Sequence, residues 1–352
     1  MTDFIRQQLS LHPSIMPQDI IKMCFQAAYG AEHLLTDINK AKGYFMSEYE
    51  SCQPNDEPVI EFIAPDVCRV NIAPWKKFSL PPEWLFQLFV QSASMRFDNS
   101  EKQFFEFIYQ WSEYARENQG QALAFSFDEF DDALQKYLAT CKNDKPRAIH
   151  HSQHYRDNEK PAYRVISGPH VRLVPILTAL AGMGGGVIAI DGRAASGKST
   201  LAAGLKSVIG AEIVHMDDFF LPAHLRTQER LNEPGGNVHY ERLAEEVLPN
   251  LHDKVNAFEY RVFNCGTMSY NGTRKIMPRK WLVVEGSYSH HPKLGDYMDV
   301  RVFSTIDATT QISRITARNG EKLTEMFATK WIPMEEKYFD GYKIAENAQL
   351  RV

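Results

Sequence analysis

A chain of 352 residues is too long for one ordinary hydrophobic core, so its length predicts two domains. Hydrophobic residues make up 44% and charged residues 24%, which is typical of a folded, water-soluble protein. The net charge of −5 argues against a large basic surface, so neither nucleic acid nor a membrane is an expected partner.

Cysteines and apolar segments indicate the compartment. The five cysteines are an odd number without CxxC spacing, so we expect reduced thiols in the cytoplasm, with neither disulfides nor zinc. The first residues lack the apolar segment of a signal peptide. The uncharged stretch 173–190 is long enough to span a membrane. However, Pro175 and four glycines at 182 and 184–186 predict a short helix, a link and a buried strand.

The first half predicts mainly helices. In "PQDIIKMCFQAAYG", the residues Ile21, Cys24, Phe25 and Ala28 share one helical face, with Pro17 suited to the start and Gly30 to the end. Further helices are predicted at 81–95, 100–115 and 127–141. Alternation in "VCRVNI" at 67–72 predicts a short strand that separates an apolar face from a face bearing Arg69 and Asn71.

The second half alternates strand-like and helical segments. The predicted strands are 186–190, 211–216, 280–286 and 300–304, and the helices between and after them are 201–210, 240–251 and 309–319. This alternation is typical of a doubly wound parallel sheet. We therefore predict a mainly helical α+β domain at 1–183 and an α/β domain at 184–352, divided at the glycine cluster.

A phosphate-binding motif lies near the start of the second domain. "GRAASGKS", residues 192–199, matches G-x-x-x-x-G-K-[ST] between a predicted strand and a helix. In such a loop, backbone N–H groups surround a triphosphate, the lysine contacts the β- and γ-phosphates, and the serine hydroxyl binds Mg²⁺. The predicted nucleotide site comprises Gly192, Ala194, Ala195, Ser196, Gly197, Lys198, Ser199 and Thr200.

Carboxylates follow two other predicted strands. Asp217 and Asp218 come after the strand at 211–216, and Glu285 ends the strand at 280–286. Because the carboxyl ends of parallel strands meet at one edge of a sheet, these acids should lie near Lys198. A kinase needs a Mg²⁺ ligand and a base at this edge, whereas acids that merely end strands are also common.

Four segments together resemble the uridine kinase and phosphoribulokinase-like family of P-loop kinases. They are "IDGRAASGKST", "HMDDFF", "VVEGSYS" and "QISRITARN", and the resemblance covers about residues 186–339. It implies that Asp217 is the base for the acceptor hydroxyl and that Glu285, with Ser199, belongs to the Mg²⁺ site. It also implies a lid helix whose Arg314 and Arg318, on one helical face, close over the phosphates.

The acceptor side departs from this family. "FEYRVFNCGTMSY" retains Tyr260 but has Cys265 where a base-binding histidine is expected, and Asn319 replaces the lid's usual aspartate. Candidate substrate residues are Asp218, Tyr240, Tyr260 and Arg261. In "FATKWIPMEEKYF", residues 327–339, Trp331 and Glu335 are either substrate contacts or part of a packing helix.

The first domain resembles an uncharacterised bacterial domain found alone or fused to such kinases, which implies no particular chemistry. Glu32, His33, His150, His151, Tyr155 and Arg164 are its notable polar residues. We predict that Arg69, Asn71 and the histidines at 33, 150 and 151 line one pocket for a small anion or part of the acceptor. Ordinary structural histidines are the alternative.

The sequence thus predicts a cytoplasmic enzyme that uses ATP and Mg²⁺ to phosphorylate a hydroxyl of a small molecule. The alternative is a switch module in which ATP binding or hydrolysis controls the first domain. RNA-end phosphorylation is disfavoured by the negative charge. A homo-oligomer is compatible with the sequence, which names neither the acceptor nor the pathway.

Overall fold

A computed structural model of the chain describes residues 2–31, 35, 37–95, 97–118 and 123–352. Internal contacts divide the chain into two compact units, Met1–Val174 and Pro175–Val352. The division falls within helix α9 (Leu173–Ala179), ahead of the glycine cluster where the sequence placed it. Among the described residues, no helix is long and apolar enough to cross a membrane, and the uncharged stretch forms α9 and then a strand.

The N-terminal unit is a mixture of helices and a small antiparallel sheet, as predicted. The sheet has the order β1-β2-β3, with β1 at Ile60–Ala64, β2 at Val67–Asn71 and β3 at Tyr163–Ser167. The helices are α1 (Thr2–Leu11), α2 (Pro17–Tyr29), α3 (Ile38–Ser51), α4 (Ile72–Lys77), α5 (Pro82–Ala93), α6 (Ser100–Glu117), α7 (Phe127–Ala139) and α8 (Gln153–Glu159).

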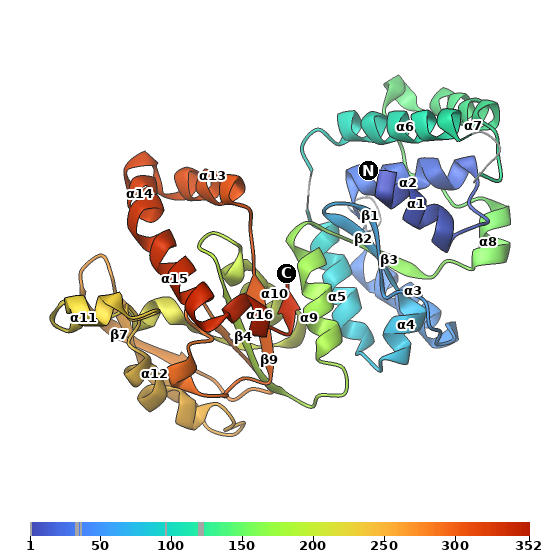
Figure 1. Ribbon diagram of the computed structural model, residues 1–352. Helices are drawn as coiled ribbons and strands as arrows, with labels where there is room; N and C mark the ends of the chain where they lie inside the picture. Colours follow the sequence, from blue (N-terminus) through green and yellow to red (C-terminus); the bar gives the residue numbers. More distant parts are fainter. Residues whose placement is uncertain (1, 32–34, 36, 96, 119–122) are drawn as a thin grey trace. The chain divides into compact units, whose positions relative to one another are not determined.

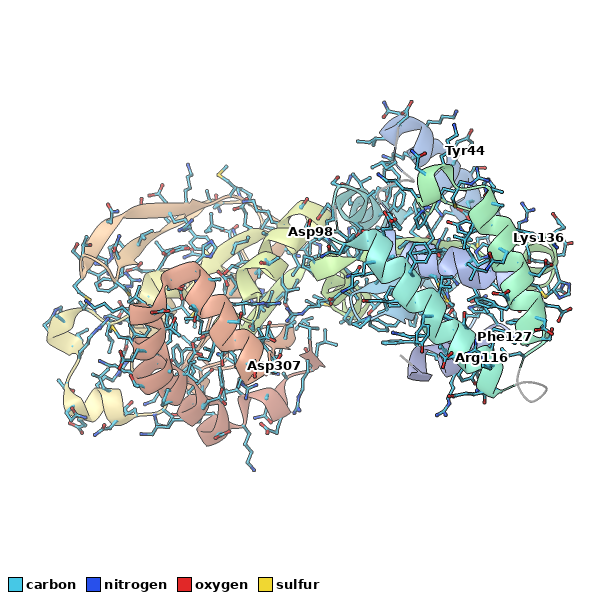
Figure 2. The ribbon with its side chains drawn as sticks, turned by 90° about the horizontal axis from the view of Figure 1, so that it is seen from above. Tyr44, Asp98, Arg116, Phe127, Lys136 and Asp307 are labelled. Carbon is cyan, nitrogen blue, oxygen red and sulfur yellow. The ribbon has the colours of Figure 1, made fainter. Side chains whose placement is uncertain are left out.

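Helix α2 is the centre of this unit. It starts at Pro17, and Gly30 follows it with φ +57°, as the sequence predicts. The helix contacts β1, β2, α6 and α7, while α5 contacts β3 (Figure 1). Where α6 ends and α7 begins, the Arg116 guanidinium lies 4.7 Å from the centre of the Phe127 ring (Figure 2).

Strand β2 confirms the short strand predicted from the alternation at 67–72, and the structure adds its burial. It is the middle strand of the sheet, and all five of its residues are buried. Arg69 and Asn71 are therefore buried together with the apolar residues of the strand, and Ile72, predicted as its last residue, begins α4. Alternation in the sequence cannot reveal this, because it does not show that helices cover both faces of the sheet.

The C-terminal unit contains the predicted parallel sheet. Its order is β10-β9-β4-β8-β5, with β4 at Gly186–Gly192, β5 at Glu212–His215, β8 at Trp281–Glu285, β9 at Val300–Ser304 and β10 at Leu350–Arg351. The middle residues of β4 and β8 form continuous buried runs of valine, isoleucine, leucine and alanine, as expected for strands that are covered on both faces. The α/β prediction is confirmed.

Helices and one hairpin complete this unit. The helices are α10 (Lys198–Ile209), α11 (Gln228–Asn232), α12 (Tyr240–Glu246), α13 (Ala308–Asn319), α14 (Glu321–Met326), α15 (Ile332–Tyr342) and α16 (Ile344–Asn347). A hairpin outside the main sheet joins β6 (Phe258–Asn264) to β7 (Ser269–Ile276). Figure 1 shows α13, α14 and α15 as consecutive orange and red helices.

Candidate active site

The phosphate loop joins the central strand β4 to α10, the strand–loop–helix context that the motif requires. Gly192 has φ +140°, and a Cβ at this position would lie 2.0 Å from the carbonyl oxygen of Ser304. Gly197 precedes α10 with φ +98°. Both backbone conformations favour glycine, and the loop ends at a helix N-terminus, which favours an anion.

Gly192→Ala should therefore disrupt the loop, lowering both the thermal midpoint of unfolding and the affinity for ATP. Gly210→Ala is the matched control, because Gly210 has φ +67° but a Cβ added there would have no neighbouring atom within 4 Å. That control should cost about 1–2 kcal/mol, the penalty of the left-handed conformation alone. Thermal unfolding of both variants measures the difference, and equal losses would contradict the steric argument.

Lys198 lies over its own loop. Its Nζ donates hydrogen bonds to the carbonyl oxygens of Gly192 at 2.7 Å and Arg193 at 2.8 Å. The ammonium is thereby held beside the loop backbone at the start of α10. A lysine in this place supplies a positive charge to phosphate oxygens bound by the loop.

A hydroxyl and a carboxylate are hydrogen-bonded to each other at the residue that follows the lysine. The hydroxyl of Ser199 donates to Oε2 of Glu285 at 3.1 Å, and Nδ1 of His215 lies 2.5 Å from the other carboxylate oxygen. The strand register places His215 opposite Glu285, with β4 on the other side of β8. A hydroxyl beside a carboxylate fits the preference of Mg²⁺ for hard oxygen ligands. His215 is a neighbour that the sequence analysis missed, although it directly precedes "MDD".

The adjacent acids Asp217 and Asp218 have different surroundings. Asp217 is solvent-accessible, and no described residue donates a hydrogen bond to its carboxylate. Desolvation by the surrounding protein, followed by the charge of Glu285, raises the pKa of Asp217. Asp218 is buried, and its Oδ2 accepts hydrogen bonds from the hydroxyl of Tyr260 at 3.0 Å and from Nε of Arg274 at 3.1 Å. Asp217 is therefore the more accessible of the two carboxylates, while one oxygen of Asp218 is already bound within the protein.

The remaining candidate substrate residues already have protein partners. Tyr260 is buried and bound to Asp218, while the neighbouring Arg261 on β6 is exposed and forms an ion pair with Glu246 on α12. Successive residues of a strand point to opposite faces, so the structure does not bring Arg261 together with Tyr260. The hydroxyl of Tyr240 accepts a hydrogen bond from Arg230.

The predicted lid arginines lie differently along α13. Arg314 donates to the carbonyl oxygen of Ala195 at 3.3 Å, which brings it to the phosphate loop. Arg318, one turn further along, is exposed and donates to Asn319 of its own helix. Helix α13 is capped at its start by Asp307, whose carboxylate accepts from the backbone N–H of Thr310 (Figure 2).

Glu335 and Glu336 of α15 hold the phosphate loop from another side. Glu335 accepts hydrogen bonds from the backbone N–H of Ala194 at 2.9 Å and from the hydroxyl of Ser287 at 2.7 Å. Burial raises the pKa of Glu335, an effect that the nearby Lys198 opposes. Glu336 binds Arg193 through two hydrogen bonds, at 2.7 and 2.9 Å. The segment around residue 335 is therefore a packing helix that also contacts the loop.

Comparisons with known proteins also point to uridine kinases. No family model matches the chain. A uridine kinase from Chlamydia pneumoniae is 23% identical over 168 residues, which cover 44% of this chain and 76% of that protein. A solved structure of a possible uridine kinase from Bacillus stearothermophilus has 18% identity and a TM-score of 0.39, covering 51% of this chain and 94% of that one.

A solved structure of the YGR205w protein has 13% identity and a TM-score of 0.29, covering 49% of this chain and 80% of that one. The match to the uridine kinase agrees with the family resemblance of this sequence. Over about half of its length, the chain is therefore related to the uridine kinase-like P-loop kinases.

Proposed function

We propose that the C-terminal unit is a kinase that transfers the γ-phosphate of ATP to a hydroxyl group of a small molecule. The observation that supports this best is the placement of three groups of side chains at the carboxyl ends of β4, β5 and β8. These are Lys198 on the phosphate loop, the Ser199–Glu285 pair and the accessible carboxylate of Asp217. A phosphoryl transfer needs a cation at the phosphates, a metal site and a base.

In the proposed reaction, the acceptor oxygen forms a bond to the γ-phosphorus while the bond from that phosphorus to the β–γ bridging oxygen breaks. The acceptor proton moves to the Asp217 carboxylate, and ADP leaves. Lys198 and Arg314 neutralise the phosphate oxygens, with Arg318 joining them only if α13 moves. Bound to Ser199 and Glu285, Mg²⁺ would supply further charge neutralisation. Positioning and electrostatics carry such reactions, so no covalent intermediate with the protein is needed.

A metabolite screen that follows ADP release from Mg·ATP tests this proposal. The Lys198→Ala variant supplies the blank for contaminating activity. An acceptor that raises ADP release at least about tenfold over the acceptor-free rate and is recovered as a phosphate ester would support the kinase. Steady hydrolysis of ATP that no acceptor increases would instead favour the nucleotide-driven switch.

Uridine and cytidine should be poor acceptors, even though the sequence relative is a uridine kinase. Cys265 lies in the turn between β6 and β7, where the family resemblance implies a base-binding histidine, and burial, followed at a distance by the charge of Asp217, raises the pKa of its thiol. A thiol is a weak hydrogen-bonding substitute for histidine. The guanidinium of Arg226, which opposes that pKa rise, adds a cation better suited to an anionic or sugar-like acceptor.

The measurement is kcat/KM for both nucleosides beside sugars, sugar phosphates and pantothenate-like alcohols. A site with base-edge partners rejects an analogue that lacks them by about 10⁴-fold, whereas a site without such partners gains little from the base. We expect values for uridine and cytidine below about 10⁴ M⁻¹s⁻¹, the lower end for a true substrate. Higher values would show that other residues bind the base.

A further inference from the structure

A second polar pocket lies in the N-terminal unit. It has a volume of about 340 Å³, is open to solvent and is lined by Lys22, His150, His151, Arg156, Lys160 and Pro161. Lys22 comes from α2, Arg156 from α8, and the other residues from the segments that flank α8. Three of the lining residues are cations, and none is a carboxylate. Of the predicted pocket residues, His33 lies outside the described residues.

Lys22 is the most unusual member of the lining. Its side chain is partly buried, and among the described residues no group forms a hydrogen bond or ion pair with its ammonium. Burial, followed by the charge of Arg69, lowers the pKa of Lys22 to about 8. The charge of Asp19 opposes this effect, but no described carboxylate forms an ion pair with the ammonium, so Lys22 has less counter-charge than buried cations normally have.

Arg69 is a further cation of this unit, whose charge contributes to the lowered pKa of Lys22. It is 1% exposed, and within the described part of the chain no carboxylate forms an ion pair with it. Its Nε and Nη2 atoms instead donate to the amide oxygen of Gln26 at 3.2 and 2.9 Å. The guanidinium also lies 4.6 Å from the centre of the Tyr163 ring. Its hydrogen-bond and ring partners are therefore neutral, while the charges of Glu61 and Asp19 stabilise it without forming an ion pair.

A directed chain of hydrogen bonds fixes this wall of the pocket. The amide nitrogen of Gln26 donates to the hydroxyl of Tyr163 at 3.2 Å, and this hydroxyl donates to Nε2 of His151 at 2.6 Å. The Nδ1 atom of His151 then donates to Asp19 at 2.8 Å. Burial lowers the pKa of His151 to about 4, so the ring is neutral at pH 7 and accepts the tyrosine proton in this arrangement.

The carboxylates near the pocket are bound by groups other than its lining cations. Asp19 accepts hydrogen bonds from His151 and from the backbone and hydroxyl of Ser152, at 2.9 and 2.7 Å. Glu61 is bound by Asn71 and by His12, whose Nε2 lies 2.7 Å away. Glu159 of α8 likewise accepts from the backbone N–H of Ser14 and lies 3.3 Å from Nδ1 of His12. Among the described residues, none of these three acids forms an ion pair with the lining cations Lys22, Arg156 and Lys160.

We propose that this pocket binds a small phosphate-bearing molecule, with Lys22 contacting the phosphate and with Arg156 and Lys160 at the rim. A phosphate dianion supplies the counter-charge that Lys22 lacks and has enough acceptor oxygens for several N–H donors. The volume suits a small metabolite. This site is separate from the phosphate loop and does not depend on the proposed kinase activity.

The test uses the full chain carrying Lys198→Ala, which weakens phosphate binding at the kinase loop. Lysines are ¹³C-methylated, and the Lys22 signal is assigned by its loss in Lys22→Met. Inorganic phosphate, added at constant ionic strength, should shift this signal saturably. It should also raise the pKa of Lys22, because a bound anion stabilises the ammonium. The exposed Lys145 provides the control signal, which should not move.

A second variant keeps the test independent of Lys22. Arg156→Gln with Lys160→Gln changes two residues at the rim of the pocket, so folding should survive, while phosphate affinity should fall at least about tenfold. An unchanged affinity in this double variant would overturn the proposal. So would a Lys22 signal that responds equally to chloride. Tighter binding of malonate than of phosphate would overturn the assignment to a phosphate-bearing ligand.

Discussion

Lys198→Ala should lower Mg·ATP-dependent turnover by at least about 10³-fold while the fold is retained. The lysine is the cation held beside the phosphate loop, and its present partners are two carbonyl oxygens of the loop itself. Its loss removes charge neutralisation where the transferred phosphate must lie. The measurement is ADP release in the presence of an acceptor found by the screen, together with ATP affinity.

Lys206→Ala is the matched control for this change. Lys206 lies on the same helix, α10, but is exposed and forms an ion pair with Glu212 at 3.4 Å. Its removal should leave both turnover and ATP affinity close to those of the wild type. If Lys198→Ala bound and turned over ATP as well as this control, the loop would not be the nucleotide site.

Asp217→Asn should lower kcat by about 10²- to 10⁴-fold with ATP affinity nearly unchanged, as expected for the loss of a general base. The substitution keeps the size of the side chain and removes its charge. Since the folded protein raises the pKa of Asp217, it disfavours the ionised form. The variant should therefore be at least as stable to heat at neutral pH as the wild type.

The raised pKa also fixes the direction of the pH dependence. A base acts only when deprotonated, so kcat should fall as the pH drops through the raised pKa of Asp217. Between the unfolded and folded pKa values, the folded state binds more protons, so the contribution of Asp217 to stability declines as pH rises. A pH–rate profile of the wild type against Asp217→Asn checks this, because the variant should lack the acidic limb.

Asp218→Asn separates the two adjacent acids. Asp218 is bound by Tyr260 and Arg274, so its change should lower the thermal midpoint of unfolding more than it lowers the activity of the folded fraction. A large loss of kcat from Asp218→Asn beside a harmless Asp217→Asn would reverse the two roles. That outcome would move the proposed base to the buried residue.

Several features of the protein followed from local sequence. The limits of α2 were predictable because Pro17 and Gly30 constrain the backbone wherever they occur. The phosphate loop was predictable because the glycines, lysine and serine that suit a bound triphosphate all lie within eight residues. The parallel sheet followed from alternating strands and helices, and that order alone placed Glu285 near Lys198 and Ser199.

Other features depended on partners that are distant in the sequence. "DD" gives no sign that Asp218 is bound by Tyr260 and Arg274 from a hairpin while Asp217 remains accessible. Nor does it show that Arg261, a candidate substrate contact, is paired with Glu246.

Partners that are distant in the sequence also form the contacts of α15 with the phosphate loop and the wall of the N-terminal pocket. Glu335 reaches Ala194 across 141 positions, and His151 reaches Asp19 across 132. Residue type and spacing determine which local backbone conformations are favourable. They do not determine which buried polar groups pair, because each pairing depends on how whole elements pack and exclude water. The sequence by itself thus determined the loop and the sheet. Only the tertiary structure decided which polar side chains are bound within the protein and which can bind another molecule.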